Sequence, residues 1–329
     1  MRAVVVDEFG PPEGLRVAEV PPPTPGPGEV VVSVRAAPVN YVDLLVTGGS
    51  YQFLPQRPFV PGKGPAGIVI AAGPGVATLQ VGDRVLAMAE QGGYAEAVAV
   101  AADQCYRLPA TMSFDMAASL SLAYDTAWFA LRERARLEPG ETVLVLGASG
   151  AVGQAAVQLA RAMDARVLAG IARSDKAAEM LAAGAEAVID LSRPDLHDSL
   201  RRQVFAATGG TGADIVLDPL GGEVFAAALR ALAWRGRLVV IGFAAGAIPT
   251  MRVNYLLLKN IEVSGLQISD YRKRRPEQVA VAFAEIFSLC EQGGIKPAAV
   301  TAFPLERAGE ALAALRDRNL AGRAVLHPS

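Results

Sequence analysis

The sequence predicts an α/β protein in which a β-rich domain is combined with a doubly wound parallel sheet. Short Val-rich runs separated by Pro and Gly clusters fill residues 1 to about 110, and this spacing is typical of a barrel-like or sandwich-like unit. From about residue 113, apolar positions at helical spacing, among them a helix expected over 223–234, alternate with short buried strands, which indicates a doubly wound parallel sheet. The last 60 or so residues hold too few elements for a third domain, so we expect them to complete the first.

The composition excludes several classes of protein. The chain has 329 residues, of which 52% are hydrophobic and 19% charged, with a formal net charge of −2. No basic surface suited to a nucleic-acid backbone is evident, and we expect the cationic run 272–275 to be a solvated loop. The N-terminus lacks a long apolar segment, and the uncharged stretch 143–160 contains glycines and polar residues that favour strand plus helix over a membrane span. We therefore expect a cytoplasmic protein that binds neither nucleic acid nor membrane.

Residues 143–171 predict a strand, a glycine-rich turn, a helix and a second strand. The turn is a variant of the dinucleotide-binding fingerprint, with Ala148 where the first glycine usually lies, followed by Gly150 and Gly153. Gly150 would let the backbone approach a pyrophosphate, and Gly153 would permit close packing of helix on strand. The alternative is a glycine-rich turn without a ligand. The expected phosphate contacts are Ala148, Ser149, Gly150, Ala151, Val152 and Gly153.

The end of the second strand indicates which dinucleotide would bind. An NAD site usually has Asp or Glu there to accept hydrogen bonds from the ribose hydroxyls, whereas this chain has Gly170-Ile171-Ala172. The side chains of Arg173, Ser174 and Lys176 follow, and the two cations can make charge-assisted hydrogen bonds to a 2′-phosphate. We therefore predict NADPH as the cofactor. The alternative is that Ser174 caps the next helix and the cations are solvated.

A series of short motifs runs along the whole chain, and in this order they resemble the medium-chain dehydrogenase/reductase superfamily, in its zinc-free, zeta-crystallin-like quinone oxidoreductase branch. The motifs are Arg2-Ala3-Val4, Gly28-Glu29-Val30, Val39-Asn40-Tyr41-Val42-Asp43, Val81-Gly82-Asp83-Arg84-Val85, Gly92-Gly93-Tyr94-Ala95-Glu96, Gly147 to Gly153, Asp218-Pro219-Leu220-Gly221-Gly222 and Gly322-Arg323-Ala324-Val325-Leu326.

The resemblance implies a fold and an activity. It implies a GroES-like catalytic domain of residues 1–118 and 268–329, a Rossmann NADP(H)-binding domain of residues 119–267, and an active site in the cleft between them. It also implies an NADPH-dependent reductase that transfers hydride directly, without zinc, to a quinone or another conjugated carbonyl compound. An enoyl-CoA or enoyl thioester reductase remains an alternative, as does an NADPH-binding structural or regulatory protein. The branch is commonly a homodimer paired through the last strand of the cofactor domain, here 261–265.

The resemblance also implies roles for particular residues. Tyr51, Asn40 and Tyr41 are the candidate catalytic residues, with the Tyr51 phenol a possible proton donor to an enolate. The further cofactor contacts are Asn40, Thr126, Gly242, Phe243, Ala244, Leu266 and Arg323. No metal site is expected, because Asn40 and Gly62-Lys63-Gly64 stand where zinc-dependent relatives need Cys and Gly-His-Glu. The only histidines, His197 and His327, have no ligand partner at metal spacing.

Overall fold

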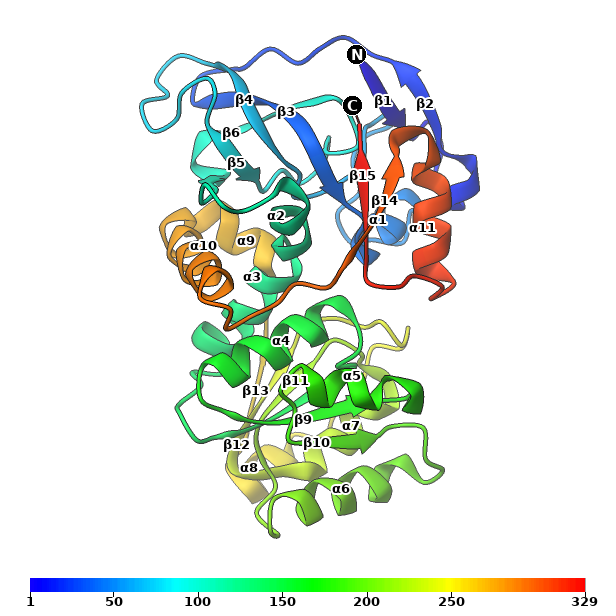
Figure 1. Ribbon diagram of the computed structural model, residues 1–329. Helices are drawn as coiled ribbons and strands as arrows, with labels where there is room; N and C mark the ends of the chain where they lie inside the picture. The colour runs from blue at the N-terminus through cyan, green and yellow to red at the C-terminus, as the bar shows by residue number, and fades with distance from the viewer. Residues whose placement is uncertain (329) are drawn as a thin grey trace. The chain divides into compact units, whose positions relative to one another are not determined.

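The computed structural model describes residues 1–328 and divides the chain into two compact units. Unit 1 comprises Met1–Leu122, Ser269–Glu291 and the chain from Pro297 onward, and unit 2 comprises Ala123–Ile268 and Gln292–Lys296. Both units combine helices with a sheet (Figure 1). The protein is therefore an α/β protein, as predicted, in which three separate chain segments form one unit.

Unit 2 is built on a six-stranded sheet whose neighbouring strands are all parallel. The strand order is β10-β9-β8-β11-β12-β13, so the order reverses between β8 and β11, which is the pattern of a doubly wound sheet. Helices α4 and α6 lie on opposite sides of it (Figure 1). The strands are β8 (Thr142–Leu146), β9 (Arg166–Ile171), β10 (Ala187–Asp190), β11 (Ala213–Asp218), β12 (Leu232–Val240) and β13 (Glu262–Gly265).

The central strands of unit 2 are continuous apolar runs because helices cover both faces of the sheet. Every residue of β8 is buried, and Leu144, Leu168 and Val216 form one core with apolar residues of the flanking helices. The helices are α3 (Ala123–Trp128), which continues as a π-helix (Phe129–Arg134), α4 (Ala151–Ala162), α5 (Ala177–Ala182), α6 (Leu196–Ala207), α7 (Gly222–Ala231) and α8 (Asn254–Lys259).

Unit 1 contains a seven-stranded sheet to which the end of the chain contributes two strands. The order is β14-β15-β3-β4-β5-β7, with β6 paired to β3, and β15 lies antiparallel to β3 (Figure 1). The strands are β1 (Arg2–Val5) and β2 (Arg16–Glu19), which form a separate two-stranded sheet, then β3 (Glu29–Pro38), β4 (Ala66–Ala72), β5 (Arg84–Ala87), β6 (Ala97–Ala101), β7 (Cys105–Arg107), β14 (Val300–Pro304) and β15 (Arg323–His327). The helices are α1 (Tyr41–Thr47), α2 (Phe114–Leu120), α9 (Ile268–Arg274), α10 (Pro276–Glu291) and α11 (Ala308–Arg316).

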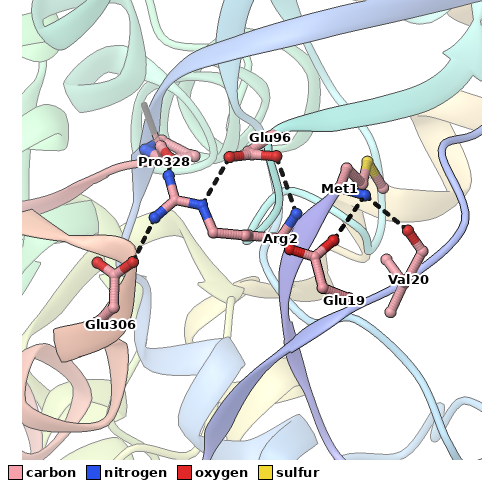
Figure 2. Close-up of polar contacts among 7 residues, drawn as sticks. All are labelled: Met1, Arg2, Glu19, Val20, Glu96, Glu306 and Pro328. Carbon is pink, nitrogen blue, oxygen red and sulfur yellow. Dashed lines mark hydrogen bonds and ion pairs between the residues drawn. The ribbon is translucent and has the colours of Figure 1, made fainter.

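A charged cluster around Arg2 fastens the two ends of the chain within unit 1 (Figure 2). The Arg2 backbone N–H and Nε donate to the two oxygens of Glu96, at 2.9 and 2.8 Å. Its two terminal nitrogens donate to Glu306 Oε1 and the Pro328 carbonyl oxygen, at 2.6 and 2.8 Å. The hydrogen bonds and the charge from Arg2 lower the pKa of Glu96. Arg2 therefore links the first strand to the segment that carries Glu96 and to residues 306 and 328 near the other end of the chain.

Two sequence predictions about local structure were wrong. The cationic run 272–275 is helical and not a loop over most of its length: residues 272–274 belong to α9, and Arg272 is 2% exposed, although residues 273–275 are solvated as expected. The helix predicted over 223–234 ends at Ala231, because Leu232 already pairs with Ala213 of β11 and starts β12. Among residues 1–328, no helix is both long enough and apolar enough to cross a bilayer.

Candidate functional site

The glycine-rich turn lies at the carboxyl end of β8, where open parallel sheets bind ligands. Gly147 has φ +60°, which favours glycine. A Cβ on Gly153 would lie 2.3 Å from the Gly147 carbonyl oxygen, so only glycine lets α4 start this close to the strand. Gly150, with φ −78°, is under no such backbone constraint, and a Cβ there would lie 3.3 Å from the same oxygen. The absence of a side chain at Gly150 thus leaves room beside the first turn of α4, and this geometry fits the pyrophosphate of a dinucleotide.

The loop after β11 contacts the glycine-rich turn on one side and the loop after β12 on the other. A Cβ on Gly147 would touch Leu220 at 3.0 Å, and one on Gly221 would touch Phe243 at 2.8 Å. The Ala244 N–H donates to the Pro219 carbonyl oxygen at 3.0 Å. The predicted contacts Gly242, Phe243 and Ala244 are therefore joined to the fingerprint through the loop after β11, at the same edge of the sheet, and Phe243 is 41% exposed.

Asp218 holds the loop after β11 in place, a role that we did not assign from the sequence. Its Oδ1 accepts hydrogen bonds from the N–H groups of Leu220 and Gly221, both at 2.9 Å. Its side chain is fully buried, and burial raises its pKa. The signal was present in the motif Asp218-Pro219-Leu220-Gly221-Gly222, because Asp often accepts hydrogen bonds from backbone groups two residues on.

The predicted 2′-phosphate ligands lie directly after β9. Ser174 to Lys176 form one 3₁₀ turn, and the side chains of Arg173 and Lys176 remain 49% and 33% exposed. Arg173 pairs with Asp175 at 2.7 Å and Lys176 with Glu179 at 2.9 Å. Both cations are therefore held close to the strand end by exposed ion pairs, which contribute little energy and exchange readily with other anions.

Two more predicted cofactor contacts lie elsewhere in unit 2. Thr126 is 8% exposed on α3, and its backbone N–H donates to Asp125 Oδ1 at 2.7 Å. Leu266 follows β13, and its N–H donates to the Val240 carbonyl oxygen at 3.0 Å. Leu266 therefore extends the pairing of β13 with β12 by one residue.

In unit 1, Asn40 lies at the start of α1 in a buried hydrogen-bond network. The Asn40 N–H donates to Asp43 Oδ2 at 2.9 Å, and the Tyr94 hydroxyl donates to the same oxygen at 3.0 Å. Asn40 Oδ1 accepts from Arg323 Nη2 at 3.0 Å. Burial raises the pKa of Asp43 to about 6, although these hydrogen bonds and Lys63 oppose the shift. The structure thus unites the predicted residues Asn40 and Arg323, which are 283 positions apart, and fixes the amide orientation.

Tyr51 and Tyr41 have different surroundings. Tyr51 is half-buried against the cluster of Val6, Val46 and Phe59, with its ring edge-on to Phe53 at a centroid distance of 6.2 Å. Tyr41, in the first turn of α1, is 50% exposed. Packing therefore holds the Tyr51 ring more firmly than that of Tyr41.

Lys63 joins the surroundings of both Asn40 and Tyr51. Its ammonium lies 5.9 Å from the centroid of the Tyr51 ring, and its backbone carbonyl oxygen accepts a 3.4 Å hydrogen bond from Asn40 Nδ2. The ammonium forms an ion pair with Glu90, which also binds Arg272 at 3.3 Å. Burial tends to raise the pKa of Glu90, but the charges of Lys63 and Arg272 outweigh it and the pKa is lowered.

The histidines bind charged side chains. His327 Nε2 lies 2.7 Å from Asp115 Oδ1, and His197 contacts Arg230. Within residues 1–328, no three His, Cys, Asp or Glu side chains form a group that could hold a metal ion.

Known proteins resemble this chain over its whole length. Residues 26–110 match the alcohol dehydrogenase GroES-like domain, and residues 151–285 match the zinc-binding dehydrogenase family. Quinone oxidoreductase-like protein 2 of Rattus norvegicus is 36% identical over 326 residues, which cover 99% of this chain and 91% of that protein. The structure of Escherichia coli quinone oxidoreductase complexed with NADPH superposes with a TM-score of 0.91 at 31% identity over 100% of both chains. The quinone oxidoreductase of Pseudomonas syringae pv. tomato DC3000 gives a TM-score of 0.91 at 29% identity over 99% of both chains.

Proposed function

This chain belongs to the medium-chain dehydrogenase/reductase superfamily, in its quinone oxidoreductase branch, and from that premise we propose that it is an NADPH-dependent reductase of quinones and other conjugated carbonyl compounds. Unit 2 is proposed as the NADPH-binding domain and unit 1 as the catalytic domain. The observation that carries the proposal is the turn of residues 147–153, with its open position at Gly150, followed by a strand end that bears cations in place of a carboxylate.

The residues of unit 2 would bind the cofactor in two places. The first-turn N–H groups of α4 and the backbone at Gly150 would hold the pyrophosphate, while Arg173, Ser174 and Lys176 would bind the 2′-phosphate. A phosphate there competes with Asp175 and Glu179 for the two cations, and it can do so because both ion pairs are exposed. This arrangement would favour NADPH over NADH.

Bound NADPH would supply hydride to the substrate and leave as NADP⁺. In unit 1, Asn40 would position the reacting group through an amide that Arg323 holds in one orientation. Tyr51 would provide the proton for an enolate, since a phenol can act as a general acid. The proposed chemistry uses no zinc, and Asn40 and Lys63 occupy the positions at which zinc-dependent relatives carry metal ligands.

We also propose that the protein forms a homodimer through β13. This strand is at the edge of the sheet, and unpaired edges favour pairing with a second strand. Leu257 and Leu258 of α8, immediately before it, are 79% and 70% exposed. Replacing both with Asp should halve the particle mass measured by light scattering, and an unchanged mass would place the contact elsewhere.

The decisive experiment follows NADPH absorbance against an ortho-quinone, a para-quinone, a conjugated enone and an enoyl-CoA, with NADH in parallel. Rapid turnover of a quinone with NADPH, and slow turnover with NADH, is the expected result. Turnover of enoyl-CoA alone would move the function to thioester reduction. Binding of NADPH without turnover of any compound would favour a structural or regulatory role.

A further inference from the structure

Lys63 is presented by a rigid turn that two glycines make possible. Gly62 and Gly64 have φ values of +97° and +67°, a region that side chains rarely adopt. A Cβ on Gly62 would lie 2.2 Å from the Tyr94 ring, and one on Gly64 would lie 2.7 Å from Ser121 Oγ. Any larger residue on either side would therefore displace this turn.

The same turn is bonded to the segment that carries Glu90. The Gly64 N–H donates to the Ala89 carbonyl oxygen at 3.2 Å, and the Gly93 N–H donates to the Gly62 carbonyl oxygen at 3.0 Å. The Lys63 ammonium and the Glu90 carboxylate thus project from two segments fixed to each other by backbone hydrogen bonds. The backbone therefore sets the distance between the two charged side chains.

Glu90 is in turn held by the helix α9. Arg272 Nη1 lies 3.3 Å from Glu90 Oε1, and the Ser269 hydroxyl also binds Glu90. Arg272 is 2% exposed, so desolvating it costs energy that its partners must offset. The chain therefore maintains a costly buried charge cluster, which anchors one carboxylate oxygen and leaves the other for Lys63.

The ammonium of Lys63 has donor capacity beyond this ion pair. An ammonium has three N–H donors, and across residues 1–328 Glu90 is the hydrogen-bond acceptor that the structure assigns to Nζ. The Lys63 side chain is 9% exposed, and a charge in such surroundings acts more strongly than in water. The ammonium lies 5.9 Å from the centroid of the Tyr51 ring, and its charge partly opposes the rise that burial causes in the pKa of Asp43, so this positive charge lies near the proposed catalytic residues.

We propose that Lys63 is a catalytic residue that stabilises the negative charge that develops on the substrate's carbonyl oxygen, with Glu90 and Arg272 as its positioning residues. The inference rests on the proposed reductase function and deepens it. When hydride reaches the β-carbon of an enone, a cofactor C–H bond breaks and a substrate C–H bond forms. The C=C π pair shifts to form a double bond between the α-carbon and the carbonyl carbon, the carbonyl π pair moves onto oxygen, and Tyr51 or water protonates the resulting enolate. Lys63 donates hydrogen bonds to that oxygen and keeps its own protons.

The expected kinetic result comes from replacing Lys63 with an apolar side chain of similar length. Removing one donor to a developing oxyanion lowers kcat by about 10²–10³-fold in other enzymes, and Lys63→Met should lower kcat for an enone by about 10²-fold. Loss of kcat for a para-quinone should be smaller, because its product is an aromatic hydroquinone that carries charge more easily. The dissociation constant of NADPH should change less than about twofold, and Lys63→Arg should recover part of the enone activity by restoring the charge.

Two controls separate charge stabilisation from a structural role. Lys63→Met leaves Glu90 paired with Arg272, so the variant should fold, which thermal unfolding will verify. Lys273→Met removes an exposed charge next to Arg272 and should leave enone kcat unchanged. Glu90→Gln should cost about tenfold, since it loosens the ammonium without removing it. An enone kcat for folded Lys63→Met within threefold of the wild type would overturn the proposal.

A binding measurement tests the inference without turnover. Bound 4-nitrophenol mimics the oxyanion, and its ionised form has a distinct absorbance. Wild-type protein should lower the pH at which the bound phenol ionises by about one unit, equivalent to about 1.4 kcal/mol, and Lys63→Met should not. Equal ionisation in both proteins would refute the role of Lys63 even if the enzyme reduces quinones. If neither quinone nor enone is turned over, the proposed function fails, and the titration still decides for or against the charge-stabilising site.

Discussion

Removing the cations after β9 should convert a selective dinucleotide site into an unselective one. A charge-assisted hydrogen bond to a phosphate is worth about one to two orders of magnitude in a dissociation constant. The exposed pairs of Arg173 with Asp175 and Lys176 with Glu179 compete only weakly with it. Arg173→Ala/Lys176→Ala should therefore weaken NADPH binding by about 10- to 1000-fold.

The assay is the dissociation constant of each dinucleotide, measured by nicotinamide fluorescence at one fixed salt concentration. NADH should change less than about threefold, because it has no 2′-phosphate. Arg166→Ala/Arg202→Ala is the matched control, since it removes two exposed, ion-paired cations from the same unit. Equal losses of NADPH and NADH in the first variant would refute the assignment of the phosphate site.

The competing carboxylate gives a test of opposite sign. Asp175 holds Arg173 through two hydrogen bonds, at 3.1 and 2.7 Å, and its charge would repel a 2′-phosphate. Asp175→Asn should therefore strengthen NADPH binding a few-fold without affecting NADH. Weaker NADPH binding in this variant would indicate that Asp175 contacts the cofactor itself.

Three further predictions concern the turn, the phenol and the buried carboxyl. Gly150→Ala should fold normally yet lose NADPH binding. Gly153→Ala should cost about 1–3 kcal/mol of stability, because its Cβ would meet the Gly147 carbonyl oxygen at 2.3 Å. Identical urea midpoints for the two variants would contradict the expected difference in stability. Tyr51→Phe should spare quinone reduction and slow enone reduction, and unchanged steady-state rates on both would leave Tyr51 a packing residue. The pKa of Asp43 is raised from 3.8 to about 6, so its stabilising contribution is present below about pH 4 and is lost as the pH rises through 6. The wild type should therefore be less stable at pH 7 than at pH 4.5, and Asp43→Asn should remove about 2 kcal/mol of that difference. Urea unfolding at both pH values measures it, and the same difference in both proteins would argue against the raised pKa.

Local patterns were sufficient to predict the elements that carry the cofactor turn. The apolar run ending at Leu146, the glycines of the turn and the helical spacing after Ala151 are all contained in about 20 consecutive residues. The parallel sheet was predictable for a similar reason, since alternating strands and helices leave few other ways to bury their apolar faces. The early end of α7 was not predictable, because pairing of Leu232 with Ala213 overrides the helical preference of the sequence around it.

The surroundings of the proposed catalytic residues depend on the tertiary structure. The sequence determined that the cations after β9 were candidates, because their residue types and position in the motif are local, and its resemblance to a known family made Asn40 and Tyr51 candidates. Only the fold decided that Arg323 fixes the Asn40 amide and that Arg272, which looked solvated in the sequence, is buried against Glu90 beside Lys63. The physical reason is that burial and ion pairing join residues up to 283 positions apart, whereas periodicity and composition report only on neighbours along the chain.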